Sequence, residues 1–432
     1  MNRLKWIDHI GNIGIDLIVL AIGILFLTSR YTGWIVLYVM IAVLGAVLPI
    51  RLLLLIHSGA KPASKTDYLL ILFYIIFEVS ILIQPQLFLP WIHVVFGWWM
   101  LGTGFLSMVD CYINLHDHLP GAPGSFLTGL ISITLALFMI LGHNMSIKTN
   151  VLSVIAGVYF ILYGIIGLLF HISLIIHSNQ PGIHSWSYST PVFMNAFMPL
   201  RFYNSIHELK LASRLEVKKE EIPTDLHVYI YLKGKGPEMF GHIDISYKGT
   251  IWSYGNHDPK TRRLLGTYGD GVLIKADEKR FLQESIGTDG KTVICYGIRI
   301  TEEQGKLIEN RIAGLMKRAV RWKCDAEIAH DRGKDMSSCR DYASRVYKET
   351  FCEMYKFTKG KYRTYFISST NCVMIADELI RNPDLHLIDL NGIVTPGSYL
   401  SFLNTEYLKP DSIVVSRTLY ESGVREAIPQ PE

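Results

Sequence analysis

Long apolar stretches separated by short polar breaks occupy roughly the first 180 residues of the chain. Six of them are long enough to cross about 30 Å of hydrocarbon, at residues 11–29, 33–56, 68–85, 89–113, 125–142 and 150–176. A helix satisfies its backbone hydrogen bonds internally, which the open edge of a sheet cannot do in lipid. The pattern therefore predicts six transmembrane helices. No convincing small-residue cleavage site follows the first stretch, so we expect it to remain in the mature protein.

The second, fourth and sixth stretches end in related sequences. Each has a histidine followed by small residues and proline, at residues 56–62, 115–123 and 176–182. The spacing of about 60 residues indicates three repeated helical hairpins. In this pattern the N-terminal half resembles the six-helix HdeD-like membrane family of bacteria, which is built of repeated hydrophobic hairpins.

Lysine and arginine residues near the helix ends indicate how the helices are oriented. They gather before the first stretch, after the second and after the sixth: Arg3, Lys5, Arg51, Lys61, Lys65, Arg201, Lys210 and Arg214. The opposite side has only Arg30 and Lys148, and the loop after the fourth stretch has neither residue type. Because the side rich in Lys and Arg faces the cytoplasm, we expect a multi-pass protein of the cell membrane. Its N-terminus and its C-terminal half would both be cytoplasmic.

A few polar residues fall within the apolar stretches, where an isolated charge is costly. They are Asp16, Glu78, Arg51, Asp110 and His171. One interpretation is a polar site in the helical bundle that binds a lipid headgroup or passes a proton. The other is structural pairing, for example of Arg51 with Asp110, and we favour it because a transporter usually has more intramembrane polarity or broken helices.

Charged residues divide the chain unevenly. Residues 1–185 hold 7 Lys/Arg and 6 Asp/Glu, whereas the remaining residues hold 35 and 32. We predict an all-α six-helix transmembrane domain at 1–185, an amphipathic juxtamembrane linker at 186–220, an α+β domain with an antiparallel sheet at 221–420, and a tail at 421–432. The net charge of +4 is spread among acidic residues, so it does not indicate nucleic acid as a partner.

The C-terminal half changes to the alternation of apolar and polar residues that is typical of strands. Strands are predicted at 227–232, 242–247, 250–254 and 291–300. Lys248-Gly249 would form the hairpin turn between the second and third of them. Thr301-Glu302-Glu303-Gln304 is a capping box, which begins a helix predicted to run to about Lys323.

Cys372 stands at the predicted start of a second helix, directly before the apolar periodic sequence Val373–Ile380. The positive end of a helix dipole and unpaired backbone N–H groups stabilise a thiolate at this position. The same N–H groups could receive a developing oxyanion. The pattern therefore predicts that Cys372 is a nucleophile.

A thiolate nucleophile needs a proton carrier, and histidine suits that role near neutral pH. His242 is the best candidate because it begins a strand directly after Gly241, a small neighbour that would leave room for a substrate. The hairpin places residues 253–257 opposite it, so Ser253, Asn256 or His257 could orient the imidazole, and Asp258 lies just beyond. We choose His257, with Asn256 next.

Three segments carry a resemblance to a known family: Gly241-His242, Asn371-Cys372 and Thr395-Pro396-Gly397. Over roughly residues 225–415 the chain resembles the circularly permuted NlpC/P60 branch of papain-like enzymes, which includes enzymes of the lecithin:retinol acyltransferase type. In that branch the His strand precedes the Cys helix. The resemblance implies a papain-like fold with Cys372 as nucleophile, His242 as base and a polar third residue on the next strand. About 130 residues separate His242 from Cys372, which is more than in compact relatives.

Other residues compete for these roles. Cys339 follows Ser337-Ser338, which could cap a helix, but its surroundings are highly charged. His227 also begins a strand, without a preceding glycine. The six cysteines have neither CxxC pairs nor zinc-type spacing, so free thiols are expected, with no metal and no cofactor.

These features predict a membrane-anchored thiol hydrolase or acyltransferase that acts through an acyl-enzyme on an amide, ester or thioester bond. The anchor favours a lipid or lipid-modified substrate, although a peptide is also compatible. If the domain is extracytoplasmic, a peptidoglycan amidase or peptidase becomes the better interpretation. A non-catalytic membrane stress or sensor protein, and a transporter with a regulatory domain, are the alternatives from other classes. The sequence does not indicate an oligomeric state.

Overall fold

The structure, a computed structural model of the chain, consists of two compact units. It describes residues 3–29, 34–35, 38–39, 49–50, 65–176, 183–185, 199–200, 202–204, 224–233, 240–288, 290–367, 371–380, 388–390, 395–407 and 412–420. The first unit comprises Met1–Tyr112 and Gly121–Ser178, and the second comprises Ile113–Pro120 and Asn179–Glu432. The second unit therefore includes a short segment, Ile113–Pro120, that the sequence places between two predicted transmembrane helices.

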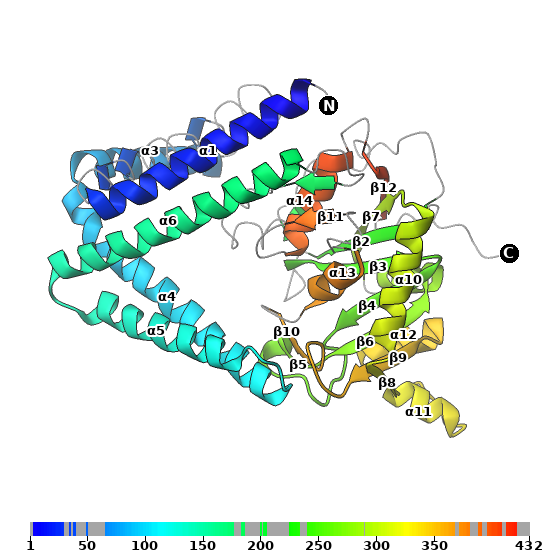
Figure 1. Cartoon of the computed structure of the whole chain (residues 1–432). Coiled ribbons are helices and arrows are strands. Elements are labelled where there is room, and N and C mark those ends of the chain that lie inside the picture. The colour runs from blue at the N-terminus through cyan, green and yellow to red at the C-terminus, as the bar shows by residue number, and fades with distance from the viewer. Residues whose placement is uncertain are drawn as a thin grey trace. The chain divides into compact units, whose positions relative to one another are not determined.

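Helices lie at five of the six positions that the apolar pattern predicts (Figure 1). They are α1 (Arg3–Thr28), α3 (Lys65–Ile83), α4 (Pro85–His116), α5 (Ala122–Leu141) and α6 (Met145–Ile176). Within the described residues, three stretches are long and apolar enough to cross a membrane: Trp91–His116, Ala122–Leu141 and Met145–Leu169. Most of the predicted helix at 33–56, most of the linker at 186–220 and the tail at 421–432 lie outside the described residues.

In the first unit α1 and α6 pack closely, because glycines of α6 face α1. A Cβ atom at Gly157 would lie 2.7 Å from Cδ2 of Leu27, and one at Gly164 would lie 2.9 Å from Cβ of Leu20. Only a residue without a side chain fits at either position. Small residues of this kind let helix backbones approach in membrane proteins, so the packing agrees with the apolar character of these helices.

The second unit is built on an eight-stranded sheet in which all neighbouring strands are antiparallel. The strands, in chain order, are β2 (Leu226–Leu232), β3 (His242–Tyr247), β4 (Thr250–Gly255), β6 (Val272–Asp277), β7 (Thr292–Ile298), β8 (Ala319–Trp322), β9 (Glu353–Phe357) and β12 (Val414–Tyr420). Their order across the sheet is β12-β7-β2-β3-β4-β6-β9-β8. The predicted antiparallel sheet is therefore present, and β3 lies near its centre.

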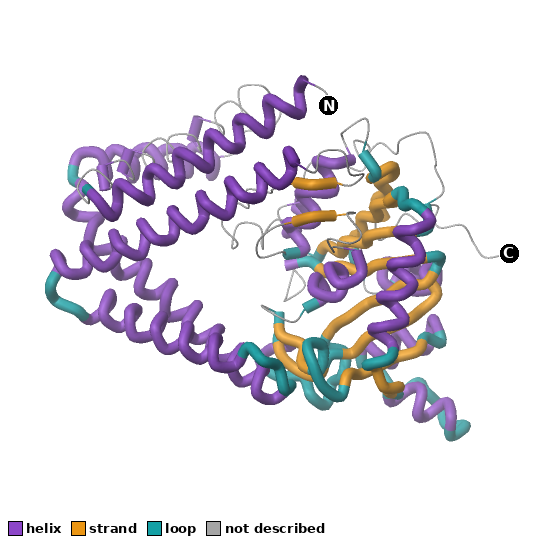
Figure 2. Tube along the Cα trace, viewed as in Figure 1, coloured by secondary structure: helices purple, strands orange, loops and turns teal. Residues whose placement is uncertain are grey.

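Two small sheets accompany the large one. In one of them β5 (Tyr268–Asp270) pairs with β10 (Thr364–Phe366) in antiparallel fashion. A short 3-10 helix, η3 (Leu264–Gly266), precedes β5 in the chain. In the other, β1 (Ile183–Ser185) pairs with β11 (Ile388–Leu390) in parallel, and Figure 2 shows the two as short orange segments.

Helices cover both faces of the large sheet and bury two apolar clusters against it. They are α9 (Glu278–Gly287), α10 (Glu302–Met316), α11 (Asp325–Asp331), α12 (Tyr342–Thr350), α13 (Cys372–Ile380) and α14 (Pro396–Tyr407). One cluster joins α10, α13 and α14 to the sheet, and the other joins α9, α11 and α12 to it. The second unit is thus an α+β unit with helices on both sides of an antiparallel sheet.

The β3–β4 hairpin has the turn that the sequence predicts. Tyr247 pairs with Thr250, and both intervening residues have positive φ, +49° at Lys248 and +75° at Gly249. A two-residue turn of this kind matches the twist of the strands that it joins. In β3 the odd-numbered side chains, such as Ile243, belong to the cluster that contains α13.

One predicted element is wrong in its extent. The capping box of Thr301 and Gln304 begins α10 as expected, but α10 ends at Met316 instead of continuing to about Lys323. The residues that follow form β8, which pairs with β9 at the edge of the sheet. Tertiary pairing overrides the local preference here, because alternation in a four-residue strand is too short to be recognised in the sequence.

Candidate active site

Cys372 is the first residue of α13, as predicted, and Asn371 caps this helix. The side-chain Oδ1 of Asn371 accepts a hydrogen bond from the N–H of Val373 at 3.0 Å, and its carbonyl accepts from the N–H of Met374 at 3.1 Å. Capping by asparagine satisfies N–H groups that a helix start leaves without a partner. Cys372 is buried, with 5% of its surface exposed. The sulfur therefore sits at the positive end of the helix dipole in a largely water-excluded place.

His242 is the first residue of β3, and the glycine before it is required for a different reason from the one we expected. Gly241 has φ +83°, and a Cβ atom there would lie 2.9 Å from Cγ of Pro199 and 3.0 Å from Cβ of Pro396. The space beside Gly241 is thus filled by two prolines. Pro396 begins α14, so the Gly-His segment and the Thr-Pro-Gly segment are in contact.

His242 lies close enough to Cys372 for the two side chains to interact electrostatically, although the two residues are far apart in the sequence. Burial lowers the pKa of His242, but the charge of Asp244, the charge of Cys372 and hydrogen bonds to both more than offset this. The net result is a His242 pKa well above its usual value. An imidazolium beside a thiolate is the charge arrangement that activates a cysteine nucleophile.

Asp244 takes the position that orients the imidazole. Its Oδ1 lies 2.9 Å from Nε2 of His242, and Oγ of Ser253 lies 3.2 Å from the same nitrogen. The Asp244 side chain is 1% exposed, compared with 23% for His242. Tyr231, on the neighbouring strand β2, packs its ring against His242. Burial and, next, the charge of Asp244 raise the pKa of Tyr231. These contacts fix the position of Nε2.

His257, the residue that we expected to orient His242, lies close by without making that hydrogen bond. Its ring stacks on Tyr342 with centroids 4.8 Å apart, and its edge lies against Gly255. Burial, followed by the positive charges of His242, Arg262 and Lys291, lowers the pKa of His257 well below its usual value. These effects favour the neutral form of His257. Asp244 makes the hydrogen bond to His242 that we expected His257 to make.

The other options for this role have partners elsewhere. Nδ2 of Asn256 donates to the carbonyl of Tyr268 at 2.7 Å, and Oδ2 of Asp258 accepts from Lys356 at 2.6 Å. Ser253 is the one hairpin option that reaches His242. Asp244 could have been found from the sequence, because residues two apart in a strand share a face and His-x-Asp therefore places a carboxylate beside the imidazole.

The rival residues do not form a comparable arrangement. Nδ1 of His227 lies 2.7 Å from Oε1 of Glu278, and its Nε2 lies 3.0 Å from Oγ1 of Thr224. Cys339 packs at the edge of the cluster on the opposite face from α13. Asp16 is buried in the first unit against Gly167, while the side chains of Arg51, Glu78 and His171 lie outside the described residues.

Within the part of the chain that the structure describes, no group of three or more His, Cys, Asp or Glu side chains is placed to hold a metal ion. All six cysteines are free thiols. No protein family model, curated protein or solved structure matches the chain. The site must therefore be interpreted from its own geometry.

Proposed function

We propose that the chain is a membrane-anchored, papain-like cysteine hydrolase or acyltransferase. Cys372 is the nucleophile, His242 carries the proton and Asp244 orients and charges the imidazole. The observation that supports this most strongly is the convergence of the three side chains at a helix start and a strand start. Asp244 and Cys372 raise the pKa of His242 well above its usual value, which favours the imidazolium.

In the first half of the reaction the Cys372 sulfur attacks the carbonyl carbon of an amide, ester or thioester, and a carbon–sulfur bond forms. The imidazolium of His242 gives its proton to the leaving amine, alcohol or thiol as the bond to that group breaks. The acyl group is then held as a thioester on Cys372. Because the N–H groups of Val373 and Met374 donate to Asn371, we assign the backbone N–H of Cys372 as the donor to the oxyanion.

In the second half, the neutral imidazole takes a proton from water or from another acceptor. The resulting oxygen or nitrogen nucleophile attacks the thioester carbonyl, and the carbon–sulfur bond breaks to regenerate the thiolate. Water as acceptor makes the enzyme a hydrolase, and a lipid hydroxyl or amine makes it an acyltransferase. Both outcomes use the same three side chains, so the acceptor decides the reaction.

A lipid or lipid-modified acyl donor is the substrate class that best fits the whole chain. Three described helices are long and apolar enough to cross a membrane, and they precede the unit that carries the thiol. An active site held near a bilayer meets membrane-bound substrates at a high effective concentration. We expect the anchored enzyme to act on such molecules in preference to soluble peptides.

Alkylation by iodoacetamide, resolved by site with peptide mass spectrometry on the full-length protein, tests this proposal. An ordinary thiol is almost fully protonated at pH 6 and reacts slowly, whereas the imidazolium of His242 should keep Cys372 reactive. His242→Ala should slow alkylation of Cys372 by about a hundredfold or more, and Cys339→Ala should leave it unchanged. An unreactive Cys372, or one whose reactivity does not depend on His242, would rule out the mechanism.

A further inference from the structure

The segment between α4 and α5, Ile113–Pro120, belongs to the same compact unit as the candidate active site. Its central residue, Asp117, is completely buried. Oδ2 of Asp117 accepts from the N–H of Thr364 at 3.1 Å, and Oδ1 accepts from Oγ1 of Thr364 at 2.9 Å. The carbonyl of Asp117 accepts from the N–H of Gly360 at 3.0 Å. One aspartate thus holds both ends of the turn formed by residues 360–364.

Arginine and histidine neighbours strengthen this attachment. Nη1 of Arg363 donates to the carbonyl of His116 at 2.6 Å, and its Nε lies 3.8 Å from Oδ1 of Asp117. Nδ1 of His116 lies 2.7 Å from the same oxygen. A buried carboxylate is costly unless it is paired and hydrogen-bonded, and here both conditions are met. The contact is therefore a buried, hydrogen-bonded part of the second unit.

The 360–364 turn that Asp117 holds also contacts the helix that carries the nucleophile. The hydroxyl of Tyr362 donates to the carbonyl of Met374 in α13 at 3.0 Å, and it also bonds to Glu378. The hydroxyl of Tyr254, from β4, donates to the carbonyl of Tyr362 at 3.0 Å. Tyr254 lies close enough to both Asp117 and Cys372 for their charges to raise its pKa, after burial and the charge of Tyr365.

A second connection runs along the chain from the same turn. Thr364 begins β10, and one residue beyond that strand the carbonyl of Ile367 accepts from Nδ2 of Asn371 at 2.7 Å. Asn371 is the residue that caps α13 next to Cys372. The turn therefore reaches the start of the nucleophile helix by two routes, through the Tyr362 hydroxyl and through the Asn371 side chain.

We propose that Asp117 is a positioning residue for Cys372, acting through the 360–364 turn on the start of α13. The inference rests on the proposed function of Cys372. It gives the α4–α5 segment a role in the reaction beyond anchoring, because the chain on each side of Asp117 is an apolar helix that could cross a membrane. A change in the spacing of α4 and α5 would reach the nucleophile through Asp117.

Iodoacetamide alkylation of Cys372 in the full-length protein separates positioning from simple stability. Two quantities are measured, the fraction of Cys372 that is finally alkylated and the rate constant per reactive site. In Asp117→Ala we expect complete alkylation with a rate constant about tenfold lower. Thr364→Val, which removes the hydroxyl, should act in the same direction, and Thr364→Ser should restore the wild-type rate. The double variant Asp117→Ala with Thr364→Val should be no slower than Asp117→Ala alone, because both changes break one contact.

His118→Asn is the matched control. His118 is exposed, lies in the same segment and has φ +57°, a conformation that asparagine tolerates. The rate of Cys372 alkylation in this variant should equal the wild-type rate. A wild-type rate constant in Asp117→Ala, even with a lower final fraction, would reduce Asp117 to a structural role. If His242→Ala still slows the reaction in that case, only this inference fails. A wild-type rate in His242→Ala would overturn the proposed function as well.

Discussion

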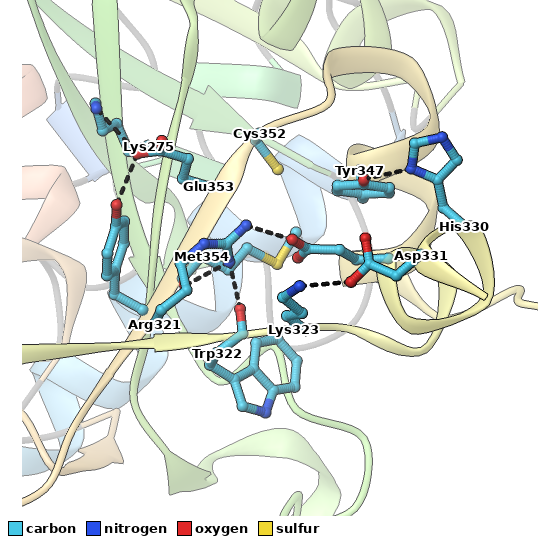
Figure 3. Close-up of polar contacts among 12 residues, drawn as sticks. Lys275, Arg321, Trp322, Lys323, His330, Asp331, Tyr347, Cys352, Glu353 and Met354 are labelled. Carbon is cyan, nitrogen blue, oxygen red and sulfur yellow. Dashed lines mark hydrogen bonds and ion pairs between the residues drawn. The ribbon is translucent and has the colours of Figure 1, made fainter. Parts of the chain in front are cut away.

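Two regions of the second unit each contain a cysteine, a histidine and an acidic residue, but only in one of them do these side chains interact with one another. At the starts of β3 and α13, His242 bonds to Asp244 and lies close enough to Cys372 for the sulfur to raise the His242 pKa. Around β8, β9, α11 and α12 there are likewise a cysteine and a histidine, Cys352 and His330 (Figure 3), and an acidic residue, Glu327 in α11. The second region is a set of structural contacts, and its geometry shows why.

Each member of the second region is engaged with a different partner. Burial raises the pKa of Cys352 to about 12, so its thiol stays protonated. Nδ1 of His330 lies 3.0 Å from the hydroxyl of Tyr347, and Figure 3 shows this imidazole directed at Tyr347. Glu327 pairs with Arg321, which also donates to the carbonyl of Met354 at 2.9 Å. Burial alone makes a cysteine inert, whereas burial beside an imidazolium at a helix start activates it.

The two histidines should give the largest contrast. His242→Asn removes the proton carrier and is expected to lower turnover, measured with an acyl ester substrate, by about a thousandfold. His330→Asn should leave turnover within about twofold, because this ring contacts Tyr347 and Phe351 and none of the three proposed site residues. Equal effects of the two substitutions would remove the distinction between the regions.

The two acidic residues should differ less, and pH reveals the difference. Asp244 raises the pKa of His242, so activity should be retained at neutral pH and lost as pH rises through that raised pKa and the imidazolium loses its proton. Asp244→Asn lowers the His242 pKa, and the alkaline loss of activity should therefore move to lower pH. We also expect a rate reduced by about 10- to 100-fold. In Glu327→Gln the pH profile should be that of the wild type, and a shifted profile there would contradict the comparison.

The smallest expected effect is on the free energy of unfolding, when the two cysteines are replaced. Cys352 is buried in the cluster that contains α12, and Cys352→Ala should lower the free energy of unfolding by about 1 kcal/mol while turnover stays intact. Cys372→Ala should abolish turnover and change the thermal midpoint less. Thermal unfolding of both variants, beside the turnover assay, checks the pair. Loss of turnover in Cys352→Ala without unfolding would show that the second region takes part in the reaction.

Several features of the candidate site follow from short-range patterns. Asn371 before an apolar periodic sequence indicates a helix start, and Lys248-Gly249 between alternating sequences indicates a hairpin. Both are present in the structure. The end of α10 is different, because β8 forms only through pairing with β9. The hydrogen bond to His242 was also expected from the wrong residue, since His257 lies past the end of β4 with its ring on Gly255, while Asp244 shares a face with His242 and bonds to it.

The sequence by itself determined that an apolar helical part precedes an α+β part, and that Cys372 and His242 stand at the starts of their elements. Periodicity, capping and turn residues act over a few neighbouring positions, so they can be recognised in a single chain. Only the tertiary structure decided that His242 and Cys372 come close enough to interact and that Asp117 bonds to Thr364. These contacts join residues separated by more than a hundred positions, and burial and charge between such residues exist only once the chain has folded.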